Sequence, residues 1–258
     1  MLSKQNILQV KLILFFICLF SIAHLQAQSI LTDRPDQTEG SSTIGRGDLQ
    51  IELGVLIGFT GESGNSTRQI LAPTTLFRYG ITKGIELRFL SQFETAKTGD
   101  IEIEGISDLQ IGTKIQILKD PTKNIEIAFL SHLIVPTGTT ELSLDKVGSI
   151  NDLSISHSLS ENVGLGYNLG YNYYGVGQGD LAYTIALGVS VNDKVGVYIE
   201  SFGDLVEFED HLTSFDAGFT YLQNDQLQFD FSFGTGINHT MNYISLGFSW
   251  WMQNGTNE

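Results

Sequence analysis

Apolar and polar residues alternate along most of the chain from Asp48 onward. The clearest run begins at Val163, where every second residue up to Tyr173 is apolar or aromatic and the residues between are glycine or asparagine. A period of two places successive side chains on opposite faces of a β-strand. The same test predicts about twelve strands in one domain, near 48–60, 68–79, 85–94, 107–118, 125–136, 150–159, 163–174, 181–191, 195–204, 212–222, 226–235 and 243–251.

The connections between the predicted strands alternate in length. The tight turns are 80–84, 119–124, 160–162, 192–194 and 223–225, whereas 95–106 and 137–149 are predicted to be long loops. Short turns on the periplasmic side and longer loops on the outer side are typical of outer-membrane β-barrels.

The apolar face of the predicted strands carries no Asp, Glu, Lys or Arg, although 17% of all residues are charged. A charge facing lipid at the midplane costs about 2–4 kcal/mol, so contact with lipid explains this face. A soluble β-sandwich would also alternate, but it explains neither the loop pattern nor the charge-free face. The sequence therefore predicts an all-β fold, a transmembrane antiparallel up-and-down barrel of about 12 strands.

Aromatic residues fall at both ends of the predicted strands, as interfacial Tyr and Trp do in membrane proteins. The predicted girdles contain Tyr79, Tyr221 and Trp250 at the periplasmic end, and Phe59, Phe93, Tyr171, Tyr173, Tyr183 and Phe233 at the outer end.

The first 27 residues have the pattern of a signal peptide, with Lys4 and Lys11 around and before an apolar run at 12–23. We expect cleavage after Ala27, which would also remove Cys18, the only cysteine. The predicted division is a signal peptide at 1–27, a periplasmic N-terminal segment at 28–47 and the barrel at 48–258. The expected location is the bacterial cell outer membrane.

Charge narrows the range of partners. Loss of Lys4 and Lys11 leaves 12 Lys and Arg (14 minus 2) against 29 Asp and Glu, a formal charge of −17. Nucleic acid is excluded because phosphate binding needs clustered Lys and Arg. We expect contact with outer-membrane lipid and lipopolysaccharide, and with a small solute.

The polar face of the predicted strands would line the lumen. A barrel of about twelve strands lies between one that side chains fill and one that holds an open channel, so the lumen is expected to be narrow or plugged. The inward charged residues could brace the barrel, line a pore, or do both, and the basic ones should pair with carboxylates. The candidates are Glu52, Arg78, Glu86, Arg88, Glu94, Asp108, Lys114, Glu126, Asp152, Glu200, Asp216 and Asp230, together with His132.

Enzymatic chemistry has little support in the sequence. His132, His157, His211 and His239 have none of the short spacings of a zinc site. His157 lies beside Ser156 and Ser158, but near the periplasmic end, which is the wrong place for an outer-leaflet hydrolase. We expect no catalytic residue, no metal and no cofactor.

The segment Thr32-Asp33-Arg34-Pro35-Asp36-Gln37-Thr38-Glu39 has no strand pattern but is distinctive. It resembles the opening of the outer-membrane transporter family labelled for the meta pathway of phenol degradation. Further matches are Arg78-Tyr79-Gly80 before Glu86-Leu87-Arg88, Ser107-Asp108-Leu109 with Lys114, Pro136-Thr137-Gly138 and Tyr198-Ile199-Glu200.

This resemblance implies a barrel that passes small molecules, aromatic or apolar ones among them. Within the opening motif Asp33, Arg34, Pro35 and Asp36, we expect the charged residues to fold into the periplasmic mouth and pair with lumen charges; a loose periplasmic tail is the alternative.

Three functions stay open at this point. The first is a channel or transporter with a narrow acidic lumen that favours cations. The second is a structural or loop-mediated binding barrel with a plugged lumen, and the third, a remote one, is an outer-membrane hydrolase.

Overall fold

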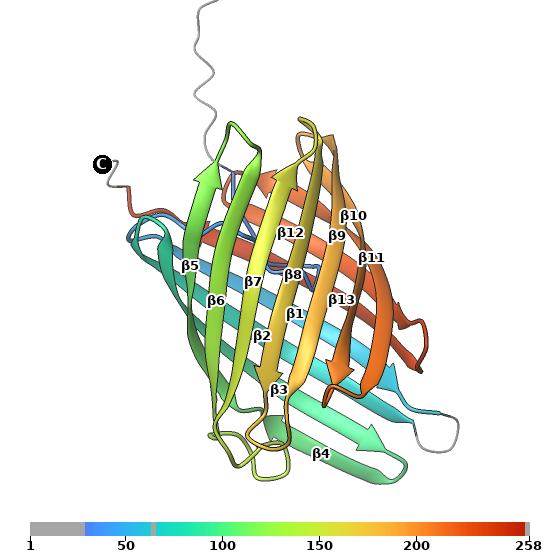
Figure 1. Ribbon diagram of the computed structural model, residues 1–258. Coiled ribbons are helices and arrows are strands. Elements are labelled where there is room, and N and C mark those ends of the chain that lie inside the picture. Colours follow the sequence, from blue (N-terminus) through green and yellow to red (C-terminus); the bar gives the residue numbers. More distant parts are fainter. Residues whose placement is uncertain (1–28, 63–65, 256–258) are drawn as a thin grey trace, which may run out of the picture.

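The computed structural model describes residues 29–62 and 66–255, and the predicted signal peptide with its cleavage position lies outside these residues. Strands make up most of the described chain (Figure 1). Among the described residues, no helix is long and apolar enough to cross a membrane. The strands are β1 (Leu49–Thr60), β2 (Thr67–Thr82), β3 (Ile85–Thr98), β4 (Ile101–Ile106), β5 (Leu109–Asp120), β6 (Ile125–Val135), β7 (Gly148–Ser158), β8 (Val163–Tyr173), β9 (Asp180–Asn192), β10 (Val195–Val206), β11 (Asp210–Asn224), β12 (Leu227–Gly236) and β13 (Met241–Met252).

The strands close into a single antiparallel barrel. Apart from β4 and β5, each strand pairs with its neighbour in the chain, and β1 pairs with both β2 and β13 to close the circle. Residues 93–98 of β3 pair with β4, and residues 85–90 of β3 pair with β5. β4 and β5 therefore occupy one strand position in the wall. The thirteen strands therefore make a barrel twelve strands around, which confirms the predicted fold.

The two ends of the barrel differ as predicted. The connections β2–β3, β9–β10 and β11–β12 have two residues each, and they lie at the end where the described chain begins (upper end in Figure 1). The long connection 136–147 lies at the opposite end. We refer to the first as the periplasmic end and the second as the outer end.

The prediction of a loop at 95–106 is wrong. β3 continues to Thr98, turns at Gly99-Asp100 and returns as β4, so a β-hairpin projects from the outer end. Its Ile-Glu-Ile-Glu run at 101–104 does alternate, but the acidic residues resemble those of a solvated loop. The hairpin extends past the barrel rim, where neither face needs the apolar pattern of a lipid-facing strand.

Asp108, one of the predicted lumen residues, has its hydrogen-bond partners in the outer loop 136–147. Asp108 lies in the break between β4 and β5, and its carboxylate accepts backbone N–H groups of Thr137, Gly138 and Leu144 at 2.8–3.1 Å. Burial raises the pKa of this carboxyl, but these N–H donors and the Ser143 hydroxyl outweigh burial and hold the pKa below its usual value. The residue fastens the loop 136–147 to the barrel.

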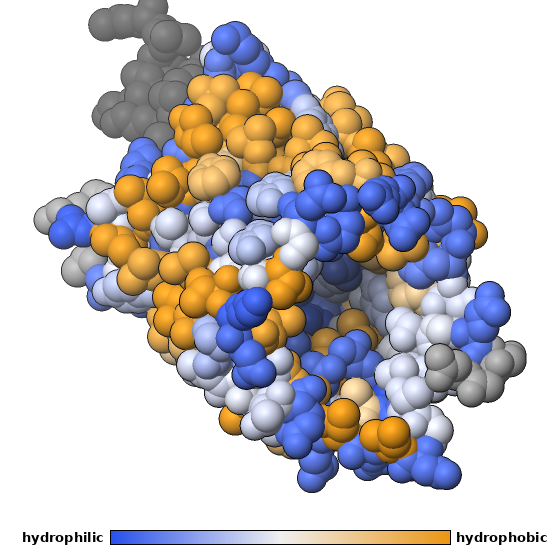
Figure 2. Space-filling model, turned by 60° about the horizontal axis from the view of Figure 1, so that its bottom comes forward, coloured by the Kyte–Doolittle hydropathy of each residue, from blue (hydrophilic) through white to orange (hydrophobic). Residues whose placement is uncertain are grey.

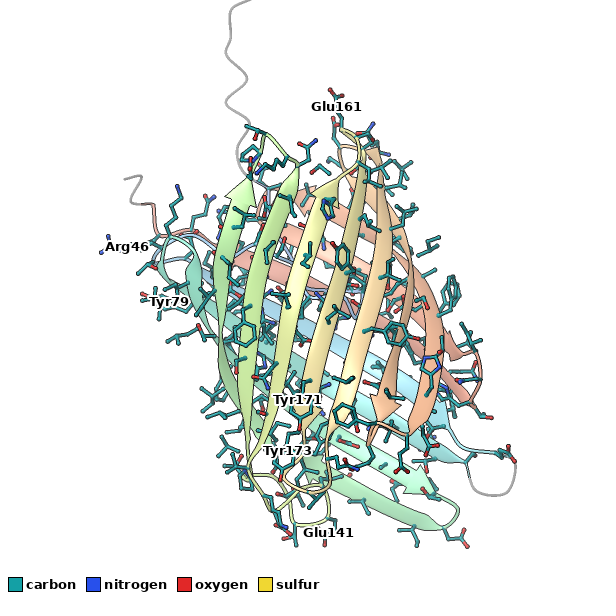
Figure 3. All side chains as sticks on the ribbon, in the orientation of Figure 1. Arg46, Tyr79, Glu141, Glu161, Tyr171 and Tyr173 are labelled. Carbon is teal, nitrogen blue, oxygen red and sulfur yellow. The ribbon has the colours of Figure 1, made fainter. Side chains whose placement is uncertain are left out.

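The outward face is apolar along the middle of the strands, and apolar surface forms broad bands on the sides of the barrel (Figure 2). The exposed aromatic residues include Tyr79 and Trp250 toward the periplasmic end and Phe59, Tyr171 and Phe233 toward the outer end. Figure 3 places Tyr79 near one end and Tyr171 and Tyr173 toward the other.

One correction applies to the charge-free face. A β-bulge between Leu71 and Thr74 shifts the register of β2, so that Arg68 pairs with outward-facing Phe59. Arg68 therefore faces outward, but at the outer rim, where the cost of a charge is small.

Replacing a lipid-facing residue at mid-strand should destabilise the barrel more than the same change at the rim. Leu246 is 60% exposed in the middle of β13, and Ile237 is 63% exposed in the outer turn 237–240. We expect Leu246→Arg to lower the free energy of unfolding in lipid vesicles by about 2–4 kcal/mol and Ile237→Arg by about 0–1 kcal/mol. Equal losses in urea titrations of the two variants would contradict a lipid-facing belt.

Candidate functional site

Residues 29–47 lie inside the barrel and fill part of the lumen; we call them the plug segment. The segment enters beside the β11–β12 turn, where the Ile30 N–H donates to the Asp225 carbonyl at 2.9 Å. It leaves beside the β2–β3 turn, where the Gly47 N–H donates to the Gly80 carbonyl at 2.7 Å. Both turns are periplasmic, so the plug segment folds into the periplasmic half of the lumen and returns. Of the two alternatives for this segment, the structure favours the folded one over a loose tail.

A buried cluster of three cations holds the plug segment on one side. Asp33 reaches Arg78 at 3.2 Å, Arg88 at 2.5 Å and Lys114 at 2.8 Å. Glu39 adds contacts of 3.0 Å to both Arg88 and Lys114. We call these five side chains the ionic cluster. It joins the plug segment to β2, β3 and β5.

The barrel wall completes the pairing of the ionic cluster. Glu52 on β1 lies 2.9 Å from Arg78, and Glu86 on β3 lies 2.8 Å from Arg78 and 3.0 Å from Arg88. All of these wall side chains are buried. The predicted pairing of the basic lumen residues with carboxylates is confirmed, with the plug segment supplying two of the four carboxylates.

Arg34 anchors the plug segment to a second part of the wall. Its guanidinium donates two bonds to Asp230, at 2.8 and 3.2 Å, and one to the Ser245 hydroxyl at 3.0 Å. It lies against Gly54 and Gly247, which are paired across β1 and β13. A Cβ atom at either position would overlap the guanidinium, so only glycine leaves room for it there.

Hydrogen bonds without a buried cation hold the third side. The Glu39 N–H donates to the Asn168 side-chain carbonyl at 2.7 Å, and the Asn168 amide donates back to the Glu39 carbonyl at 3.1 Å. The hydroxyls of Thr38 and Thr184 lie 2.7 Å apart. The Gln37 N–H donates to Glu200 at 2.7 Å. The contacts to β8 and β9 join neutral groups and are therefore weaker individually than the ionic cluster, whereas those to β10 end on the Glu200 carboxylate, which also accepts the Thr38 hydroxyl.

The two acids at the start of the plug segment have opposite electrostatic surroundings. Burial raises the pKa of Asp33, but Arg78, Lys114 and Arg88 outweigh burial and hold that pKa well below its usual value. Burial and the neighbouring Glu200 carboxylate both act to raise the pKa of Asp36 well above its usual value. The surroundings therefore favour the charged form of Asp33 and the neutral form of Asp36.

The other predicted lumen residues lie at different depths. Lys114, Glu200 and Asp230 are buried and bonded to the plug segment, and Asp216 is buried beside Glu200 and accepts the Tyr243 hydroxyl, whereas Glu94, Glu126 and Asp152 are half-buried. Glu126 accepts the Ser42 hydroxyl of the plug segment at 2.5 Å. Glu94 lies farther out, on the outer half of β3. Sequence reasoning missed Glu39 and Thr38 as site residues, although both lie in the distinctive segment 32–39 and could have been found there.

His132 is part of the lumen wall and not a metal ligand. Arg88 donates to its Nε2 at 3.0 Å, which makes this nitrogen the acceptor and leaves the proton on Nδ1, 3.1 Å from the Gln110 side-chain oxygen. Among the described residues, no group of three His, Cys, Asp or Glu side chains could hold a metal ion.

The arrangement around His157 does not form a hydrolase site. His157 stacks on Tyr167 on the outward face, and its Nε2 lies 3.2 Å from the Tyr167 hydroxyl. The Ser156 hydroxyl instead bonds Ser41 of the plug segment at 2.5 Å, inside the lumen. The serine and the histidine therefore lie on opposite sides of the wall.

The outer half of the lumen is hollow. Figure 2 shows the outer end with an opening lined largely by hydrophilic residues. The wall here carries the acidic side chains Glu94, Asp152 and Asp204, and in the described residues no hydrogen bond or salt bridge joins these three to the plug segment.

We expect Asp33→Asn to release the plug segment, because the charge that neutralises three buried cations is lost. The measurement is cleavage after Glu39 by a glutamate-specific endopeptidase, with the products identified by mass spectrometry. Wild type should be protected at Glu39 and Asp33→Asn should be cut. The control Asp193→Asn, in an exposed periplasmic turn, should match wild type. Full protection of the Asp33→Asn variant would show that the ionic cluster does not retain the segment.

Comparisons with known proteins agree with this architecture. The model of the family described as "Putative MetA-pathway of phenol degradation" matches residues 32–253. No curated protein matches the chain. Among solved structures, the KdgM porin in complex with disordered oligogalacturonate is 7% identical, covers 79% of this chain and 99% of its own, and has a TM-score of 0.56.

Two further solved structures illustrate the range of similar barrels. The KdgM porin alone is 7% identical, covers 78% of this chain and 99% of its own, and has a TM-score of 0.54. The CymD monoaromatic hydrocarbon channel is 9% identical, covers 83% of this chain and 90% of its own, and has a TM-score of 0.47. The fold is that of bacterial outer-membrane porins. Because the family model spans nearly all of the described residues, the chain belongs to the family described as "Putative MetA-pathway of phenol degradation".

Proposed function

We propose that the protein is an outer-membrane channel for small neutral or cationic solutes, closed in its periplasmic half by the plug segment. The observation that carries this proposal is the unequal filling of the lumen. Residues 29–47 fill the periplasmic half and are bonded to the wall, whereas the outer half is hollow and hydrophilic. A barrel that served only as a scaffold would gain nothing from a hydrated outer cavity.

The charge of the lumen supports selection against anions. Every basic lumen side chain, Arg34, Arg78, Arg88 and Lys114, lies within 3.2 Å of a carboxylate. Glu94, Asp152 and Glu200 have no Lys, Arg or His within 4.0 Å in the described part of the chain. Unmatched carboxylates in a confined lumen attract cations and repel anions.

The solute class follows from size and charge. An anion such as the oligogalacturonate named for the KdgM complex would meet uncompensated carboxylates here. The family description refers to phenol degradation, and phenol is small, neutral in water near pH 7 and able to form a hydrogen bond. We therefore select phenol as the first neutral solute to test.

Single-channel recording of the refolded mature chain in a planar bilayer tests the proposal. We expect discrete conductance steps with a cation-selective reversal potential under a salt gradient. The double variant Glu94→Gln/Asp152→Asn should lose most of this selectivity, because it removes two lumen carboxylates that no cation neutralises. The control Asp193→Asn should keep it. Anion selectivity in the wild type would contradict the acidic-lumen proposal.

A structural or loop-mediated binding barrel with a sealed lumen is the second candidate. The number of bonds that hold the plug segment favours it, since the segment contacts β1, β2, β3, β5, β8, β9, β10 and β12. A folded barrel that shows no conductance and takes up no phenol into vesicles would support this function instead of a channel.

A further inference from the structure

Two adjoining cavities lie between the plug segment and one side of the wall. They have volumes of about 370 and 350 Å³. Asp36, Ser158, Gly164, Gly188 and Tyr198 line both, so the two form one continuous space, which we call the side groove. The groove begins at the periplasmic turn 159–162 and reaches inward to Thr38 and Glu39.

The side groove exists because most wall positions on β8 and β9 beside it are glycine or alanine, with Tyr198 on β10 as the large side chain of its lining. The inward positions of β8, β9 and β10 at this level are Gly164, Gly166, Ala186, Gly188 and Gly196. A Cβ atom added at Gly188 would meet no atom within 4 Å, and one at Gly164 would meet only the His157 carbonyl oxygen at 3.9 Å. The opposite wall differs, because there a Cβ at Gly54 would overlap Arg34. The plug segment therefore packs tightly on one side and loosely on the other.

The inner end of the side groove is closed by one row of contacts. Those to Asn168 and Thr184 join neutral groups, and the Thr38 hydroxyl also donates to the Glu200 carboxylate. Thr38 and Glu39 line the groove, and they meet the wall through Thr184 and Asn168. One step closer to the outer end, the next lumen-facing positions are Asp152 on β7 and Gly170 on β8. The row of Asn168 and Thr184 thus separates the side groove from the outer part of the lumen.

We propose that the side groove is the periplasmic half of the permeation route, and that solutes pass beside a seated plug segment instead of displacing it. This inference rests on the proposed channel function. The opening step is local, a break of the neutral contacts of Asn168 and Thr184, while the ionic cluster stays intact. Breaking a few neutral hydrogen bonds is easier than separating buried ion pairs.

The lining of the side groove identifies the class of solute. It carries the Glu161 carboxylate, the Asp36 carboxyl group and several hydroxyl groups, whereas Glu39 is already paired with Arg88 and Lys114, and Arg34 with Asp230. Small neutral or cationic molecules that form hydrogen bonds fit this lining. Anions do not.

Covalent blocking of the side groove is the first test. Gly188→Cys places a thiol in open space, and the mature chain 28–258 has no other cysteine. A bulky methanethiosulfonate reagent is added from the periplasmic side during single-channel recording, and mass spectrometry confirms the modification. We expect modification to remove most of the conductance of Gly188→Cys and to leave the cysteine-free wild type unchanged. Comparing the same molecules before and after modification excludes misfolding as the cause of the loss.

The outcomes separate this inference from the function on which it rests. Unchanged conductance after complete modification of Gly188→Cys would overturn the side groove as the route and leave the channel function standing. A wild-type chain that folds but shows no conductance would overturn the channel function, and the route with it.

A second test concerns the row that closes the groove. Asn168→Ala removes both hydrogen bonds to Glu39 and should raise the conductance, with Glu39 still protected from the endopeptidase because the ionic cluster holds the segment. The control Ser249→Ala, at a buried lumen position on β13 away from the groove, should leave conductance unchanged. Unchanged conductance of Asn168→Ala, or cleavage at its Glu39, would overturn local opening beside a seated plug.

Discussion

The structure depends on the neutralisation of three cations that point into a closed barrel. Arg78 and Arg88 are directly paired across β2 and β3, and Lys114 lies on the next strand in the wall. Like charges opposite each other are destabilising, and a buried charge without a partner costs about 3–5 kcal/mol. The wall supplies Glu52 and Glu86, but only Asp33 touches all three cations. The plug segment is therefore part of the barrel's electrostatic balance, and its closure of the lumen is coupled to the stability of the wall.

Much of the fold could be predicted because the membrane imposes a strict pattern. Where a strand has lipid on one side and the lumen on the other, apolar and polar residues must alternate, and the run from Val163 to Tyr173 shows this without exception. Prediction failed where the constraint ends. The hairpin of β3 and β4 extends beyond the rim, and the bulge after Leu71 reverses the faces of β2 without any change in composition.

The site was predictable in its residue types but not in its arrangement. Alternation places Arg78, Arg88 and Lys114 in the lumen, and their number against the acids implies pairing. It does not reveal that half of the pairing carboxylates come from residues 29–47, because a segment without a strand pattern carries no information about depth. Asp108 shows a second limit, since alternation places it on the lumen side but does not reveal that its carboxylate holds loop 136–147.

The number of strands explains why the plug segment can close part of the lumen and still leave a groove for solutes. Eight strands leave an interior that wall side chains can fill, but twelve leave more space than they can occupy. Here the plug segment takes up the extra space in the periplasmic half, and its shape matches only part of the wall. Its charged residues match the wall around Arg34 and the ionic cluster, while the wall opposite Asp36 carries glycines and small residues that do not reach it. The wall side chains and the plug segment together do not fill the lumen, so the side groove remains. The acidic residues of the plug segment that hold it in place also influence which solutes can enter the side groove.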